Sequence, residues 1–98
     1  MTSTFTKDTV TQGRVLMAVH HDDAIVAFVK VARGNTVDAA LEDAFVATQH
    51  GIDRPDHVAL TERAESRRST MVGDTIEVRL DGFNPQFFVV APCGFDPK

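Results

Sequence analysis

Two consecutive apolar runs constrain the fold of this chain most. Residues 14–20 and 24–31 are short and apolar, and the polar residues His21-Asp22-Asp23 separate them. Short runs rich in Val and Ile with a polar break between them are typical of two strands joined as a hairpin. Neither run alternates apolar with polar residues, so we expect both faces of the resulting sheet to be covered. One helix covers one face. The other face of the sheet is then covered by the N-terminal segment, by residues 52–66, or by a second copy of the protein in a homodimer.

The segment after this hairpin predicts one amphipathic helix. Asn35 or Thr36 can accept the free N–H groups of its first turn, and apolar residues recur at three- and four-residue steps across 37–48. Gly51 is expected to cap its C-terminal end in the left-handed conformation. The acidic residues on its solvent-facing side are Asp38, Glu42 and Asp43.

The last third of the chain predicts a second hairpin. Residues 75–80 alternate apolar with polar side chains, which is typical of a half-buried strand. Residues 81–85 are turn formers, and residues 86–91 return as a strand that Pro92 ends. The charged segment 52–66 is predicted to be a loop, with a short extended piece near its middle.

The predicted order β-β-α-loop-β-β indicates the α+β class. We expect a ββαββ two-layer sandwich, in which a four-stranded, mainly antiparallel sheet packs on one helix. The 98 residues fit a single domain. Residues 1–11 are rich in Thr and Ser without periodicity and are interpreted as a flexible N-terminal arm, which leaves residues 12–98 as the domain.

Composition restricts the compartment and the partners. The chain has no apolar run near the roughly 20 residues that span a bilayer, and its N-terminus lacks the basic and apolar parts of a secretory signal. The one cysteine, Cys93, cannot form an internal disulfide, which agrees with a reducing compartment. These features predict a cytoplasmic protein without a membrane partner. The formal net charge of −4 argues against binding to a phosphate backbone.

A polar turn that runs directly into a strand is the most distinctive motif. The run Arg68-Ser69-Thr70-Met71-Val72-Gly73-Asp74 precedes the strand at 75–80, and Gly94-Phe95 lies near the end of the chain. Residues 36–95 thereby resemble small phage- and plasmid-encoded proteins, including the YodL-like group. Met71 departs from that pattern, which commonly has Ser or Thr there. The resemblance implies an origin in a mobile element and binding to a host protein, including inhibition of a restriction or CRISPR complex.

The residues of this turn support a structural and a functional interpretation. Ser69 and Thr70 can hydrogen-bond backbone groups, Gly73 can adopt a positive φ, and Asp74 can cap free N–H groups before the strand. The functional hypothesis is a non-enzymatic protein-interaction module that binds a host or phage protein. Its candidate binding residues are the basic Arg63, Arg67 and Arg68, or the acidic helix face of Asp38, Glu42 and Asp43.

Nucleic-acid binding is the alternative function. Four arginines occur close together in the sequence: Arg54, Arg63, Arg67 and Arg68. Acidic residues interleave with them, however, and would cancel most of their field within a screening length of roughly 8–10 Å. The chain also lacks Trp and Tyr, the best residues for base stacking.

Two groups of residues raise the question of chemistry. The run His20-His21-Asp22-Asp23 has metal-binding residue types, but adjacent strand residues point to opposite faces, which favours a solvated hairpin tip. Cys93 with His57 or His50 has the composition of a nucleophile and its base. The sequence around Cys93 does not support that role, so a small buried side chain is expected. We therefore predict no catalytic residue, metal or cofactor.

Overall fold

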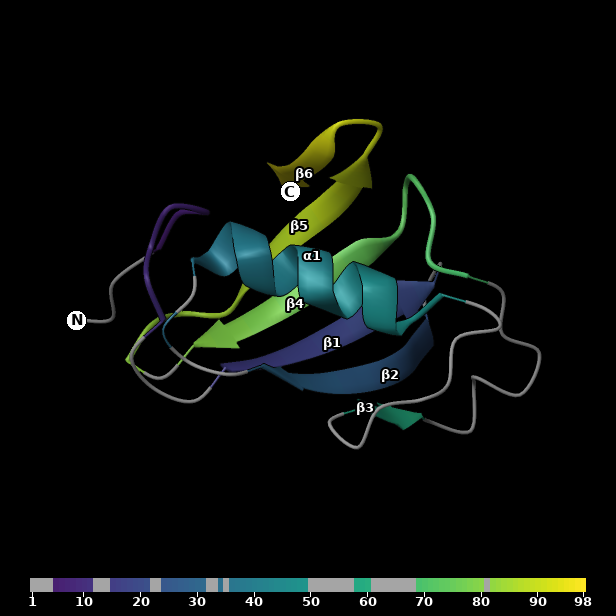
Figure 1. The fold of residues 1–98 in the computed structure, drawn as a ribbon, viewed down its shortest axis with the longest axis horizontal. Helices are drawn as coiled ribbons and strands as arrows, with labels where there is room; N and C mark the ends of the chain where they lie inside the picture. The colour runs from purple at the N-terminus through teal and green to yellow at the C-terminus, as the bar shows by residue number, and fades with distance from the viewer. Residues whose placement is uncertain are drawn as a thin grey trace.

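The computed structural model describes residues 5–11, 15–21, 24–31, 34, 36–49, 58–60, 69–80 and 82–98. Its core architecture is a six-stranded sheet with the helix α1 (Val37–Ala47) packed across one face (Figure 1). The strands are β1 (Val15–His21), β2 (Ala24–Val31), β3 (Val58–Leu60), β4 (Thr75–Leu80), β5 (Gln86–Ala91) and β6 (Gly94–Pro97). Their order across the sheet is β3-β2-β1-β4-β5-β6, and every neighbouring pair is antiparallel.

The α+β class and the antiparallel sheet on one helix are confirmed, but the four-stranded ββαββ prediction has too few strands. β3 lies in the part of 52–66 for which a short extended piece is predicted. β6 was missed, because Pro92 does end β5 but then forms the turn into another strand with Cys93. Gly94 enters β6 with φ +116°, a conformation that favours glycine. Phe95 is the one large apolar side chain of this four-residue strand, so it carries no visible periodicity.

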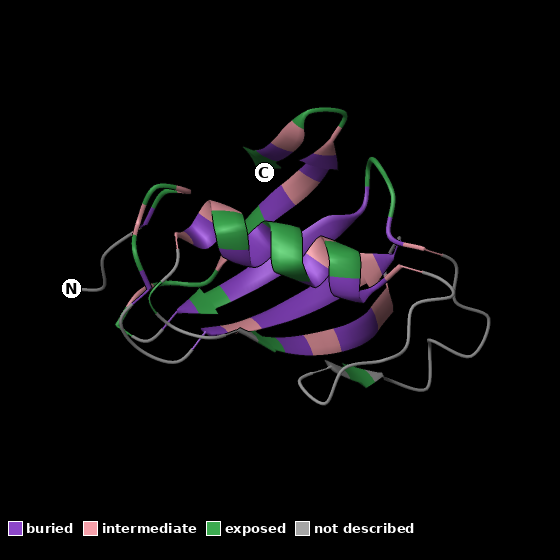
Figure 2. Cartoon of the chain, viewed as in Figure 1, coloured by how far each residue is buried: buried purple, intermediate pink, exposed green. Residues whose placement is uncertain are grey.

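The register of the central strands places one set of side chains under α1. Met17 of β1 pairs with Val29 of β2 and with Val78 of β4, so these three side chains share a face. All three are fully buried, and Figure 2 shows the buried stretches of the strands beneath the helix. Phe88 and Phe95 extend the same core toward the β6 edge.

Helix α1 follows the predicted pattern closely. Thr36 is its N-cap, and its Oγ1 accepts the Ala39 N–H at 3.2 Å, which decides between the two predicted caps. The predicted apolar stripe is buried apart from Phe45, which is half-buried, while Glu42 and Asp43 are exposed. The helix ends at Ala47 with Thr48 as its C-cap, so the prediction that Gly51 caps it is wrong; Gly51 itself lies outside the described residues. No helix in the part of the chain that the structure describes, α1 included, is long and apolar enough to cross a membrane.

The N-terminal segment packs against the domain over residues 5–11. Phe5 is only 4% exposed and contacts the edge of Phe83 at 5.6 Å between ring centroids. The carbonyl oxygens of Lys7 and Thr9 accept the N–H groups of Asp38 and Val37, two of the free donors at the start of α1. Residues 5–11, which the sequence assigns to an N-terminal arm, thus pack against the start of α1 and the core. The sequence of residues 1–11 has little periodicity, so these contacts could not be predicted from it.

The sheet face opposite α1 is apolar in part, as the uninterrupted strands predict. Phe28, Ala18 and Phe87 lie on this face, and Phe87 of β5 is 41% exposed. Residues 5–11 lie on the helix side, so they are not the expected second cover. Within the described residues no second layer covers this face, and most of residues 52–66 fall outside that part of the chain.

Candidate interaction site around the 71–74 turn

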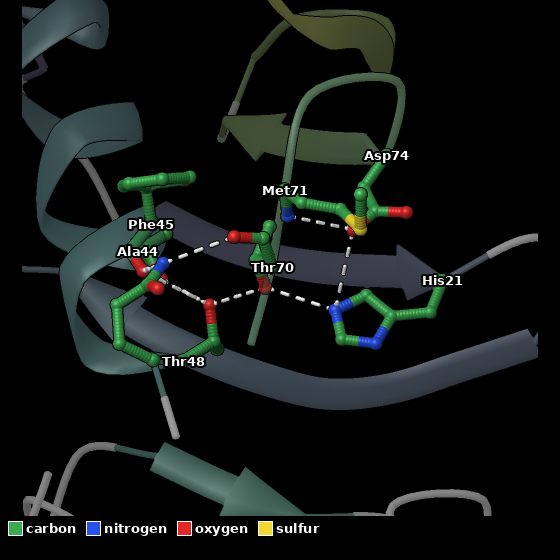
Figure 3. A network of polar contacts seen from close by, with 8 residues as sticks. His21, Ala44, Phe45, Thr48, Thr70, Met71 and Asp74 are labelled. Carbon is green, nitrogen blue, oxygen red and sulfur yellow. Dashed lines mark hydrogen bonds and ion pairs between the residues drawn. The ribbon is translucent and has the colours of Figure 1, made fainter. Parts of the chain in front are cut away.

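A buried chain of hydroxyl groups fixes the residues that lead into the turn (Figure 3). The Thr48 hydroxyl donates to the carbonyl oxygen of Ala44 at 2.9 Å, and Thr70 Oγ1 lies 2.7 Å from Thr48 Oγ1. Because a hydroxyl has one proton and that of Thr48 is already used, the Thr70 hydroxyl donates to Thr48. His21 Nε2, 2.9 Å from Thr70 Oγ1, must then carry a hydrogen and donate to it. The network joins α1, β1 and the turn.

Gln49 adds a second connection between the helix and this segment. Its side-chain amide donates to the carbonyl oxygens of Phe45 at 2.8 Å and Thr70 at 3.1 Å. The Thr70 N–H donates to the Thr48 carbonyl oxygen at 3.4 Å. Thr70 is therefore bound through its backbone and its side chain to the residues that follow the last turn of α1, and its position relative to the helix is fixed.

The turn itself is closed at both ends by hydrogen bonds. Asp74 Oδ2 accepts the Met71 N–H at 2.8 Å, and the Asp74 N–H donates to the Met71 carbonyl oxygen at 3.0 Å. Gly73 has φ +97°, and its N–H donates to the Val90 carbonyl oxygen at 2.9 Å. These contacts confirm the predicted roles of Gly73 and Asp74. Thr70 differs from its prediction, because its hydroxyl bonds the side chains of Thr48 and His21.

The tip of this rigid turn is apolar and exposed. Met71 is 52% exposed and Val72 is 55% exposed, and both follow directly after the buried Thr70. Val46, on the helix, is also an exposed large apolar residue. Single exposed apolar residues are ordinary. An adjacent pair on a turn held by buried hydrogen bonds is a feature that an interaction surface would use.

A small pocket lies beside Val72, between α1 and the β5–β6 hairpin. Its volume is about 190 Å³, below the roughly 300–1,000 Å³ of small-molecule sites. The lining residues are Glu42, Phe45, Val72, Val90, Ala91, Pro92, Gly94 and Phe95. Phe45 and Phe95 meet edge to face with centroids 6.4 Å apart. The lining side chains other than Glu42 are thus apolar, although polar atoms contribute about as much of the pocket surface as apolar ones, and its size suits one side chain better than a cofactor.

Glu42 is the one charged residue among those lining the pocket. Glu42, Phe45, Val46 and Gln49 are spaced by three and four residues, so they share one side of α1, and Asp38 precedes Glu42 by one turn on the same side. Asp43 lies about 100° further round the helix. Of the predicted acidic face, Asp38 and Glu42 therefore share one side of α1, where Glu42 lines the pocket and Asp38 is half-buried near the helix start, whereas Asp43 lies on another side.

The basic half of the predicted site cannot be placed. Arg63, Arg67 and Arg68 lie outside the described residues, as does Arg54 of the nucleic-acid alternative. The sequence analysis missed the apolar part of the site, which is Phe45, Met71, Val72 and Phe95. The signal available for it was the apolar pair inside an otherwise polar turn. Nothing in the local sequence indicated that β6 would bring Phe95 to the same place.

The two histidines of the β1 end point to opposite sheet faces, as predicted. His21 joins the buried network, and its Nε2 lies 3.7 Å from Asp74 Oδ2. His20 lies 3.7 Å from Glu77 Oε1 through its Nε2, and its ring contacts Phe87 at 6.0 Å between centroids. Asp22 and Asp23 are outside the described residues. Among the residues that are described, no three His, Cys, Asp or Glu side chains gather as metal ligands would.

Cys93 is exposed in the turn between β5 and β6, which corrects the expectation of a small buried side chain. The position follows from β6, because a two-residue turn between paired strands projects into solvent. His50 and His57, the bases suggested for it, lie outside the described residues.

Comparison with protein families, with curated proteins and with solved structures found no match to this chain.

Proposed function

We propose that this protein is a non-enzymatic protein-interaction module that binds its partner with the 71–74 turn and the adjoining pocket. The observation that carries the proposal is the exposed pair Met71 and Val72 on a turn fixed by buried hydrogen bonds. A loop that is ordered before binding loses little conformational entropy in the complex. The pair can therefore contribute apolar contact area at a low entropic cost.

The wider biological role stays a prediction from the resemblance of residues 36–95. We propose a phage or other mobile-element protein that acts in the cytoplasm on a host or phage protein, with inhibition of a restriction or CRISPR complex as its action. The neighbouring genes test this origin. Homodimer formation stays a prediction for the sheet face that carries Phe87, and light scattering over a range of concentrations measures it.

Capture from host lysate with matched variants tests the binding surface. We expect a partner that the wild-type protein retains and that Val72→Asp or Met71→Ser retains at least about tenfold less, since an apolar contact would be lost or a charge buried. Phe87→Ser is the control, because it removes an exposed apolar side chain from the opposite sheet face. Circular dichroism establishes that each variant is folded. Equal capture by wild type, Val72→Asp and Met71→Ser would refute the proposed surface.

A further inference from the structure

We infer that the partner presents a segment with one apolar side chain for the pocket and a Lys or Arg beside it for Glu42. This inference rests on the proposed function and specifies the chemistry of the partner. Three observations support it: the size of the pocket, the apolar side chains that line it, and the charge of Glu42 beside them.

The pocket selects one apolar side chain. Its walls combine the edge-to-face rings of Phe45 and Phe95 with Val72 and with the Ala91–Pro92 end of β5. Of the residues that line it, Val90 and Phe95 are buried, whereas Val72 and Glu42 are exposed. A side chain that enters would lose its water contact on several sides. Burial of that kind is the main source of affinity in small docking sites.

The charge beside the pocket selects the neighbouring residue. The helix Val37–Ala47 contains three acidic residues and no Lys or Arg. Glu42 is exposed and forms no ion pair within the described part of the chain. An incoming cation would meet an available carboxylate, whereas a phosphate or a carboxylate would be repelled. The charge thus favours a basic peptide and disfavours a nucleic-acid backbone.

The site is also directional. Along one side of α1, Asp38 and Glu42 come first and Phe45 and Val46 follow, and the exposed Val72 of the 71–74 turn lines the pocket with Glu42 and Phe45. A bound segment would place its basic residue toward the N-terminal half of α1 and its apolar residue toward the 71–74 turn. Because one exposed ion pair changes affinity by at most about fivefold, the apolar contact should dominate binding and the charge should set the preference.

Selection from a random displayed peptide library tests the inference directly. The library is selected on the full-length protein, and the enriched peptides are measured by fluorescence anisotropy with wild-type and variant proteins. We expect enriched peptides to combine an apolar residue with a nearby Lys or Arg. Because Glu42→Lys removes the ion pair and also places a like charge beside the peptide's basic residue, they should bind this variant at least about fivefold more weakly. A peptide with its basic residue changed to Glu should bind Glu42→Lys better than wild type. Asp8→Lys is the control, since it makes the same charge change at an exposed carboxylate outside the pocket lining and should leave binding unchanged.

The outcomes separate the inference from the proposed function. Peptides that lose binding to Val72→Asp but bind Glu42→Lys as tightly as wild type would overturn the basic-residue requirement and leave the interaction surface standing. Peptides indifferent to both Val72→Asp and Glu42→Lys would count against the surface itself. Enrichment of peptides without Lys or Arg, or a dimer in light scattering that Val72→Asp abolishes and Phe87→Ser does not, would likewise overturn the inference.

Discussion

Thr70 is the residue on which the geometry of the candidate site depends most. Its hydroxyl lies between His21 Nε2 and Thr48 Oγ1, and its backbone bonds the residues after α1 (Figure 3). His21 and Thr70 are 49 residues apart in the sequence. A hydroxyl in a turn predicts a hydrogen bond to a nearby backbone group. The contacts of Thr70 with His21 and Thr48 form only because strand pairing and the end of α1 bring these distant residues together. The network could therefore not be predicted from the motif.

Thr70→Val should destabilise the fold by about 1–3 kcal/mol, because it keeps the shape of the side chain but removes the buried hydroxyl that His21 Nε2 and Thr48 Oγ1 both contact. Urea unfolding followed by circular dichroism measures the change. Thr6→Val is the matched control: Thr6 is exposed, and the same substitution there should stay within about 0.5 kcal/mol of wild type. An equal effect of the two substitutions would mean that the hydroxyl chain contributes nothing to stability.

At the scale of elements, the 71–74 turn shows which structural features the local sequence can predict and which it cannot. Gly-Asp before a strand correctly predicted the positive φ of Gly73 and the capping role of Asp74. The attachment of the turn to β5, through the bonds of Val90 with Gly73 and Asp74, depends on strand pairing and has no local signal. The same reason explains why β6 was missed, while α1 with its regular period was predicted almost residue by residue.

Asp74→Ala should loosen this turn without unfolding the sheet. The Met71 N–H would lose its carboxylate acceptor, and we expect its amide hydrogen to exchange at least about tenfold faster, with a loss of about 1–3 kcal/mol in stability. Hydrogen exchange followed by NMR resolves the Met71 amide. Asp96→Ala removes an exposed carboxylate from β6 and should leave that amide unchanged. Unaltered exchange at Met71 in Asp74→Ala would contradict the account of a turn held by its own carboxylate.

At the scale of the whole molecule, one helix and one sheet enclose a core on a single side, and the site forms where three distant segments meet beside it (Figure 1). The α+β class followed from the order of apolar runs and turns. The packing of the N-terminal segment did not, because the ring of Phe5 contacts those of Phe83 and Phe88, far away in the sequence, and Gln86 Nε2 donates to its carbonyl oxygen across 81 residues. Glu42 was predicted as a surface residue, but its place beside a pocket depends on β6.

The central claim, that the rigid apolar turn is the surface that meets the partner, is tested most directly by photo-crosslinking in the host cell. A photoreactive aromatic residue replaces Val72 in one variant and Phe87 in another, since both positions are exposed but lie on different parts of the molecule. We predict a discrete crosslinked protein from position 72 that is absent from position 87. Crosslinks to the same protein from position 87 alone, or none from position 72, would contradict the claim.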